Sequence, residues 1–282
     1  MNLPKTLLQR YATGEARAIY ELVVSRCFGL SRTDILLGKD TTLSAKDKAE
    51  LQIIIDRVAK GEPVQYVLGS EEFCGHEFRV TPAVLIPRPE TQLLVQFVGQ
   101  NVPLGGRILD IGTGSGCIAV TLALAGYRVT ATDISEDALA CARGNAERLG
   151  AEVTFLGQDI LSSLPPRAGE EGFRTTSGGM DAIVSNPPYI CEGEAREVDD
   201  NVLRYEPHLA LFVPDDDPLL FYRAIADYGL QHLAAGGWLF LEGSSKRIGQ
   251  VGELLSEKGY TEVNTRIDWY DNERFVCARK RK

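Results

Sequence analysis

From residue 92 onward, short apolar runs that favour strands alternate with amphipathic runs that favour helices. The expected strands are 107–112, 128–133, 152–159, 180–186 and 238–243, with helices at 135–150, 219–237 and 246–260 among them. Apolar strands separated by helices are typically buried on both faces of a mostly parallel sheet. The last two expected strands, 261–269 and 273–280, are joined by three polar residues, so they should form an antiparallel pair at the sheet edge. The pattern predicts an α/β fold for residues 92–282.

Residues 1–65 have a different, helical periodicity. The run 14–29 places Ala18, Leu22, Val23 and Cys27 at helical spacing before Gly29, a helix stop. A second helix is expected after Ser44, which lies three residues before Asp47 in a capping-box-like start. The region therefore predicts a small all-helical domain. Its residues indicate no chemistry, so a docking or structural role is the natural interpretation.

Residues 66–91 link the two regions and are expected to contain the domain boundary. Short β-type runs separated by glycine predict a hairpin over about 66–80. Three prolines in 81–91 predict a stiff connector. Further along the chain, the Pro-, Gly-, Ser- and Thr-rich run 165–179 predicts a flexible insertion.

Charge and composition restrict the partners. The net charge of −9 and the isoelectric point near 5.0 lower the expectation of a nucleic-acid substrate. The six cysteines form no CxxC pair and the three histidines are far apart, which predicts reduced thiols and no metal site. No apolar run approaches the roughly 20 residues of a membrane helix, and the N-terminal residues lack a signal-peptide layout. A cytoplasmic protein is expected, with no membrane partner.

A glycine-rich turn follows the first expected strand directly. Gly112, Gly114 and Gly116 allow a tight turn and a close backbone approach to a ligand at the start of the next helix. Residue 117 is Cys where the dinucleotide fingerprint requires glycine, so that fingerprint is incomplete. By itself the motif is as compatible with a structural turn as with a ligand site.

Three acidic residues near strand ends favour the ligand site. Asp133 ends the second strand about 20 residues on, where a carboxylate can accept hydrogen bonds from both hydroxyls of a ribose. Asp133 could instead cap the helix that follows, although Ser135 can do this alone. Asp159 ends the third strand where an adenine would reach, and Asp110 could face an amino group. A ligand that carries a ribose, an adenine and an ammonium group would satisfy these three residues. This favours S-adenosylmethionine over NAD as the cofactor. The expected cofactor-binding residues are Asp110, Gly112, Thr113, Gly114, Ser115, Gly116, Asp133, Asp159, Ile160 and Asn186.

The fourth expected strand ends in the tetrapeptide Asn186-Pro187-Pro188-Tyr189. The side-chain oxygen of Asn186 and the carbonyl of Pro187 could accept both N–H hydrogens of a planar amide or aromatic amine, which would direct the nitrogen lone pair toward a methyl donor. Preorganised acceptors act most strongly on the positive charge that develops in the transition state. Tyr189 can stack on the planar group. Asn186, Pro187 and Tyr189 are therefore the expected catalytic residues, and the substrate site adds Pro188. A plain Pro-Pro turn is the structural alternative.

Five segments together resemble the PrmC/HemK release factor glutamine methyltransferases: VLIPRPET, ILDIGTGSGCIA, DISEDALACARGNAERLG, IVSNPPYI and YEPHLALF. The resemblance runs from about residue 62 to residue 282. It implies a Rossmann-like class I methyltransferase domain, preceded by a small helical domain and a hairpin connector. It also implies methylation, from S-adenosylmethionine, of the glutamine amide in the Gly-Gly-Gln motif of class I peptide-chain release factors, with S-adenosylhomocysteine as the product. The N-terminal domain would help to hold the release factor.

Two other functions stay open at this point. The tetrapeptide alone also fits a DNA or RNA methyltransferase that acts on the exocyclic amine of adenine or cytosine, which the acidic charge disfavours. A non-catalytic binding module is disfavoured by the intact motifs. Arg88 and Glu90 match the family connector, where either a pocket-shaping role or a salt bridge is expected. The segments 213–217 and 243–250 depart from the family pattern at the expected pocket rim.

Overall fold

The computed structural model describes residues 3–162 and 179–282. Most of the predicted insertion at 165–179 therefore lies outside the described residues. The chain divides into two compact units, one formed by Met1–Ser70 with Val198–Tyr205, and the other by Glu71–Glu197 with Glu206–Lys282. None of the described helices has both the length and the apolar character needed to cross a bilayer.

The smaller unit is all helical. Its elements are α1 (Lys5–Arg10), α2 (Thr13–Phe28), α3 (Arg32–Leu36), the 3-10 helix η1 (Lys39–Thr42), α4 (Ala45–Ala59), α5 (Val64–Leu68) and α9 (Asp200–Tyr205). Its core is a cluster of its own that includes Leu7, Ile35, Ile55 and Val58. The predicted helix start at Ser44 and the predicted helix stop at Gly29 are both confirmed. Ser44 accepts a hydrogen bond from the Asp47 amide, and Gly29 ends α2 with a φ of +66°.

The buried face of α2 differs from the prediction. Ala16, Tyr20, Val23 and Val24 are buried, whereas the side chains of Ala18 and Cys27 are exposed. Two contacts explain the rotation of the face: Tyr20 packs into the helical core, and its hydroxyl donates a hydrogen bond of 2.9 Å to the buried Asp40. A tyrosine with a hydroxyl partner can be buried, and this turns the helix away from the spacing of its aliphatic residues.

The larger unit opens with a hairpin and a short 3-10 turn and continues as a wound α/β sheet. Its elements are β1 (Ser70–Phe73), β2 (His76–Arg79), η2 (Pro89–Thr91), α6 (Gln92–Asn101), β3 (Arg107–Ile111), α7 (Cys117–Leu124), β4 (Arg128–Asp133), α8 (Glu136–Leu149), β5 (Val153–Gly157), β6 (Met180–Ser185), β7 (Ile190–Cys191), η4 (Glu192–Glu197), η5 (His208–Ala210), β8 (Phe212–Val213), α10 (Leu220–His232), β9 (Leu233–Glu242), α11 (Ile248–Glu257), β10 (Thr261–Ile267) and β11 (Glu273–Arg279). The hairpin starts later than expected, because α5 takes residues 64–68.

The seven main strands lie in the order β10-β11-β9-β6-β3-β4-β5. β3, β4, β5, β6 and β9 are parallel neighbours, while β11 pairs antiparallel with both β9 and β10. The predicted α/β fold with an antiparallel pair at the edge is confirmed. The last strand in sequence is not the outermost one, because β11 inserts between β9 and β10.

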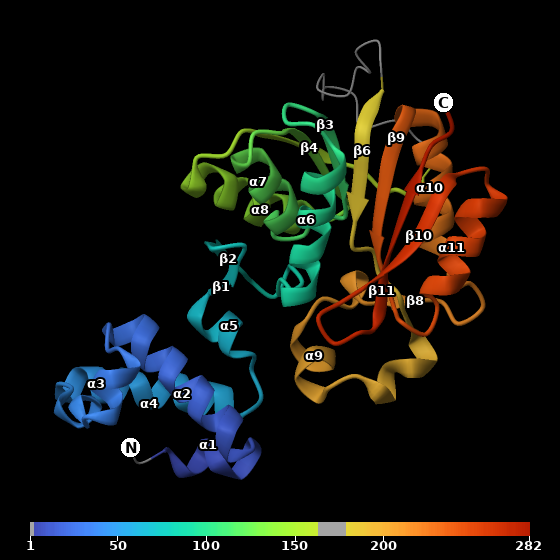
Figure 1. Ribbon diagram of the computed structural model, residues 1–282. Coiled ribbons are helices and arrows are strands. Elements are labelled where there is room, and N and C mark those ends of the chain that lie inside the picture. Colours follow the sequence, from blue (N-terminus) through green and yellow to red (C-terminus); the bar gives the residue numbers. More distant parts are fainter. Residues whose placement is uncertain (1–2, 163–178) are drawn as a thin grey trace. The chain divides into compact units, whose positions relative to one another are not determined.

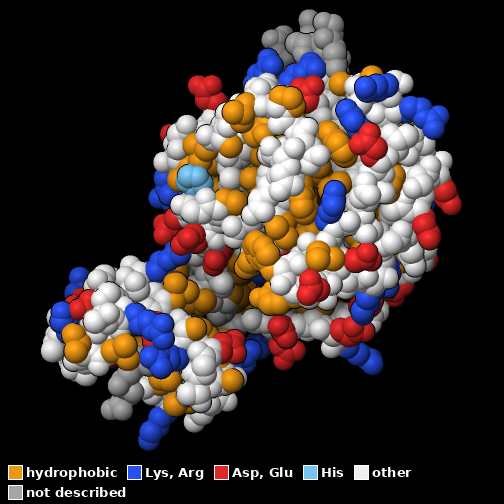
Figure 2. All heavy atoms as spheres, in the orientation of Figure 1, with side chains coloured by type: hydrophobic (Ala, Val, Ile, Leu, Met, Phe, Trp, Pro, Cys, Tyr) orange, Lys and Arg blue, Asp and Glu red, His pale blue; other side chains and the backbone are white. Residues whose placement is uncertain are grey.

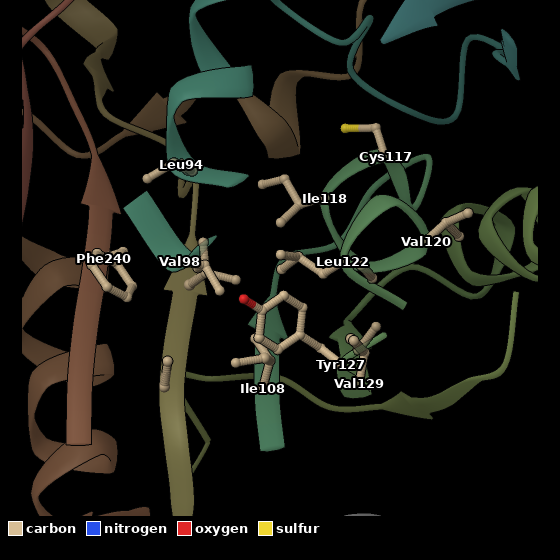
Figure 3. Close-up of a cluster of buried hydrophobic side chains, with 14 of the residues drawn as sticks. Leu94, Val98, Ile108, Cys117, Ile118, Val120, Leu122, Tyr127, Val129 and Phe240 are labelled. Atoms are coloured by element: carbon tan, nitrogen blue, oxygen red, sulfur yellow. The ribbon is translucent and has the colours of Figure 1, made fainter. Parts of the chain in front are cut away.

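Helices cover both faces of this sheet (Figure 1). On one face α6, α7 and α8 pack over a cluster that contains Ile108, Val184 and Phe240, shown in part in Figure 3. On the other face α10 and α11 pack over Leu109, Ile183 and Leu241. Successive residues of β3 and β6 thus belong to opposite cores, as expected for strands that are buried on both faces.

A second predicted element boundary is also wrong. Residues 219–237 were expected to be helical, but α10 ends at His232 and β9 begins at Leu233. The first part of β9 is irregular, since its pairing with β6 shifts in register between Met180 and Ala182. Gly236 has a φ of +76°, a backbone conformation that neither a regular helix nor a regular strand adopts. Residues 234–237 are all Ala or Gly, which show no apolar periodicity. The change from helix to strand could therefore not be predicted from the sequence.

The strand order reverses at β3, which has β4 on one side and β6 on the other. In open α/β sheets, ligands bind outside the carboxyl ends of the strands at such a reversal. The hydroxyl of Ser185, at the end of β6, donates a hydrogen bond of 2.7 Å to the Ile111 carbonyl at the end of β3. The two loops of interest, after β3 and after β6, therefore start from adjacent and tied positions.

Candidate active site

A cavity of about 360 Å³ lies at this edge of the larger unit. Its walls come from four places: the connector that precedes α6, the loop after β3, the loops after β4 and β5, and the segment after β6. Segments around η5 and α10 complete it, through Pro207, Leu209, Ala210, Phe221 and Ile225. A volume of this size is in the range of small-molecule sites.

The glycine loop after β3 lines this cavity with its backbone. The amides of Gly112 and Thr113 both donate to the Thr132 carbonyl, each at 2.9 Å, which fixes the start of the loop. Gly112 and Gly114 have φ values of +73° and +56°, and a Cβ on either would meet no atom within 4 Å. Bare backbone thus faces free space here, an arrangement that lets a ligand approach the main chain closely.

The loop is supported from behind by Asn145 of α8, a fully buried side chain. Its amide nitrogen donates to the carbonyls of Ser115 and Arg79, each at 2.9 Å, and its oxygen accepts from the Arg79 amide at 2.7 Å. One side chain therefore joins the glycine loop, α8 and the β2 strand. The sequence offered no signal for this role, because the three segments are far apart in the chain.

Two carboxyl groups lie beside the loop. Asp110 is completely buried, and burial raises its pKa to about 7, with the nearby Asp133 adding to the shift and the hydrogen bond from Thr113 opposing it. Burial also raises the pKa of Asp133, although the amides of Gly114 and Ser135 donate to its two oxygens at 2.9 Å. The helix cap of α8 is Ser135, whose side chain accepts from the Ala138 amide. Each Asp133 oxygen keeps acceptor capacity for a ligand.

The segment after β6 contributes Asn186, Pro187 and Pro188 to the lining of the same cavity. The side-chain nitrogen of Asn186 donates to the hydroxyl oxygen of Thr91 at 3.2 Å, and the Thr91 hydroxyl donates to Glu242 at 2.8 Å. Among the described residues, no hydrogen bond reaches the side-chain oxygen of Asn186 or the carbonyl of Pro187. Two acceptor oxygens are thus available at adjacent positions.

The structure brings most of the predicted site residues together, but not all. The predicted residues that line the cavity are Gly112, Thr113, Gly114, Ser115, Asp133, Asp159, Ile160, Asn186, Pro187 and Pro188. Asp110 and Gly116 are not among the residues that line the cavity. Tyr189 packs against the core cluster on the α10 side, and burial raises its pKa to about 12. Stacking of Tyr189 on a substrate stays a prediction.

The connector contributes wall residues of which the sequence analysis had considered only Arg88. Ala83, Val84, Leu85, Pro87, Arg88 and Thr91 all line the cavity. The Arg88 guanidinium forms an ion pair of 2.6 Å with the buried Glu206, which also accepts from the Ile86 amide. Arg88 therefore combines the two roles considered for it, since it lines the cavity and forms the salt bridge. Its partner Glu206 belongs to the YEPHLALF segment, so the two family segments meet here.

Comparison with known proteins identifies the family. A release factor glutamine methyltransferase from Bacteroides thetaiotaomicron is 45% identical over 278 residues, which cover 98% of this chain and 97% of the relative. The chain belongs to the release factor glutamine methyltransferase family. A second member, from Flavobacterium psychrophilum, is 36% identical over 93% of this chain and 91% of its own length.

Two domain models match parts of the chain. The PrmC N-terminal domain matches residues 5–69, and the methyltransferase small domain matches residues 89–204. A 16S rRNA methyltransferase from T. thermophilus, solved with AdoMet and guanosine, has a TM-score of 0.52 and 21% identity, covering 75% of this chain and 50% of that one. That likeness shows a shared methyltransferase fold.

Proposed function

We propose that this protein methylates the side-chain amide nitrogen of the glutamine in the Gly-Gly-Gln motif of class I peptide-chain release factors. The observation that carries the reaction is that the glycine loop and the Asn186-Pro187 segment line the same cavity. The names of its full-length relatives support glutamine as the acceptor. The interspersed acidic and basic side chains on the face seen in Figure 2 support a protein substrate over a nucleic acid, whose backbone favours a basic surface.

The residues of the loop wall fit S-adenosylmethionine. The open space in front of Gly112 and Gly114 can accept a ligand against the backbone, and Asp133 can accept hydrogen bonds from ribose hydroxyls. Asp159 and Ile160 would lie along the adenine. One oxygen of the buried Asp110 has no hydrogen-bond partner among the described residues. When bound, S-adenosylmethionine supplies an electrophilic methyl group.

In the same cavity, Asn186 and Pro187 would orient the glutamine amide. An amide nitrogen is a poor nucleophile because its lone pair is delocalised. Hydrogen bonds from both of its N–H groups to the Asn186 oxygen and the Pro187 carbonyl would fix its plane and favour the positive charge that forms on nitrogen. The loop is stiffened by two prolines and holds these acceptors in place before the substrate arrives.

The helical unit would hold the body of the release factor, and the Gly-Gly-Gln loop would enter the cavity. This assignment implies that an intact release factor is a much better substrate than a short peptide with the same motif. It also implies a cytoplasmic enzyme, because translation termination takes place there.

Labelling tests the proposal directly. We expect radiolabel from S-adenosylmethionine to appear on a release factor and to disappear when the glutamine of its motif is replaced by alanine. Equal labelling of both proteins, or labelling of DNA or RNA instead, would contradict it. A short Gly-Gly-Gln peptide in the same assay measures how much the rest of the release factor contributes.

The variant Asn186→Ala tests the acceptor role. We expect kcat to fall by about 10²-fold or more, by analogy with the loss of one preorganised oxyanion-hole group. The dissociation constant for S-adenosylmethionine, measured by calorimetry, should change much less. Asn264→Ala is a matched control, because Asn264 lies on the outer strand β10 and, among the described residues, its side chain bonds the Glu262 carbonyl alone. Activity of Asn186→Ala within a fewfold of the control would refute the role.

A further inference from the structure

We propose that Thr91 and Glu242 are positioning residues that set the direction of the Asn186 side-chain amide. The inference rests on the proposed function and extends it to residues with no assigned role. The three side chains form a hydrogen-bonded series, from the Asn186 nitrogen to the Thr91 hydroxyl at 3.2 Å, and from that hydroxyl to Glu242 at 2.8 Å.

The fold brings the three residues together from distant parts of the chain. Asn186 follows β6 directly and Glu242 ends β9, and these strands pair in parallel with Ser185 opposite Leu241. Thr91 ends η2 in the connector. Thr91 and Glu242 are 3% and 1% exposed, so water does not compete for their hydrogen bonds. The series is therefore part of the buried wall behind the substrate segment.

Donor and acceptor chemistry decides which group donates and which accepts in each hydrogen bond of the series. A carboxylate can only accept, and a threonine hydroxyl has one hydrogen to donate. When that hydrogen goes to Glu242, the Thr91 oxygen can only accept, so Asn186 must present its nitrogen to Thr91. Because the amide group is planar, its oxygen then faces away from Thr91, and no hydrogen bond from a described residue engages it.

The opposite orientation would place an N–H donor where the substrate also has N–H groups. Such an Asn186 rotamer could not accept from the glutamine amide, and two donors would face each other. In its ionised form, Glu242 thus selects the productive rotamer before substrate binds. Burial of a carboxylate is unfavourable. Burial raises the pKa of Glu242 to about 7, although the hydrogen bond from Thr91 and the positive charge of Arg274 both lower it.

The test is a kinetic series on the full-length enzyme with intact release factor. Thr91→Val keeps the shape and removes the hydroxyl, and we expect kcat to fall about tenfold, the loss of roughly one net hydrogen bond. The dissociation constant for S-adenosylmethionine should stay within twofold. Thr91→Ser should restore most of kcat, because it restores the hydroxyl. Thr121→Val is a matched control, since Thr121 is buried in α7 and its hydroxyl has no partner among the described residues.

Two further variants separate positioning from general packing. In Asn186→Ala, adding Thr91→Val should cause no further loss of kcat, because the amide to be oriented is gone. Glu242→Gln can both donate and accept, so it no longer enforces one direction, and kcat should fall severalfold. The inference is overturned if Thr91→Val or Glu242→Gln keeps kcat within twofold of wild type, or if the losses at Thr91 and Asn186 multiply. Failure of the wild-type enzyme to label the release factor would instead refute the proposed function.

Discussion

At the scale of single residues, the site contains acidic groups that destabilise the fold when ionised. Asp110 is completely buried beside the glycine loop, and its pKa of about 7 lies far above the usual 3.8. A carboxyl group with a raised folded-state pKa favours the folded protein in its protonated form. Its contribution to stability is therefore complete below about pH 3.8 and is lost as the pH rises through about 7. The protein retains this residue in spite of that loss, as is common at functional sites.

The variant Asp110→Asn should remove this pH dependence. At pH 8 the free energy of unfolding of wild type should be lower than that of the variant by up to about 4 kcal/mol, at 1.36 kcal/mol per pKa unit. At pH 4 the two proteins should be nearly equal. Urea denaturation at both pH values measures the difference. A variant that is less stable than wild type at pH 8 would show that the ionised Asp110 is compensated by its neighbours.

At the scale of elements, two of the three glycines in the glycine loop have similar backbone conformations but different surroundings. Gly114 and Gly116 have φ values of +56° and +80°. A Cβ on Gly116 would lie 3.0 Å from the Cβ of Ala142 in α8, whereas a Cβ on Gly114 would meet nothing within 4 Å. Gly116 thus allows α7 and α8 to approach each other, and Gly114 keeps the cavity wall free of side chains.

Alanine at the two positions should therefore produce different defects. Both variants bear the strain of a positive φ, about 1–2 kcal/mol. Gly116→Ala adds the clash with Ala142 and should have the lower melting temperature of the two. Gly114→Ala should instead weaken S-adenosylmethionine binding about tenfold or more, equivalent to about 1.4 kcal/mol. Thermal melts and calorimetry measure both effects, and equal melting temperatures would argue against the close approach at Gly116.

The elements also show what the sequence could predict. Strand positions and the glycine loop follow from local periodicity and turn chemistry, so the α/β fold and the part of the cavity wall formed by the loops after β3, β4, β5 and β6 could be predicted. The contact between Thr91 and Glu242 joins residues 151 positions apart, and the ion pair of Arg88 with Glu206 joins residues 118 apart. Such pairs depend on how strands and connector are arranged in space, for which spacing along a single sequence carries no signal.

At the scale of the whole molecule, the two units have separate hydrophobic cores. The core of the helical unit consists of residues from α1 to α5, and the cores of the larger unit lie on the two faces of the sheet. Among the described residues, those that line the cavity all belong to the larger unit. A ligand of that cavity should therefore stabilise one unit directly.

Calorimetric unfolding should show two transitions, of which S-adenosylmethionine raises only the one that belongs to the larger unit. At a ligand concentration of 100 times the dissociation constant, the gain is about 2.7 kcal/mol. For a unit of this size, that gain corresponds to roughly 5–10 °C. NAD is a suitable control ligand and should shift neither transition. A single transition that moves as a whole with S-adenosylmethionine would show that the units unfold together.

The helical unit is discontinuous in sequence, since α9 (Asp200–Tyr205) belongs to it while both flanking segments belong to the larger unit. The chain therefore passes between the units three times, next to Ser70, Val198 and Tyr205. For protein engineering, a chimera that exchanges only residues 1–70 between two family members would combine a foreign bundle with the original α9. A graft designed to exchange the whole helical unit should carry both segments, with crossover points at all three junctions.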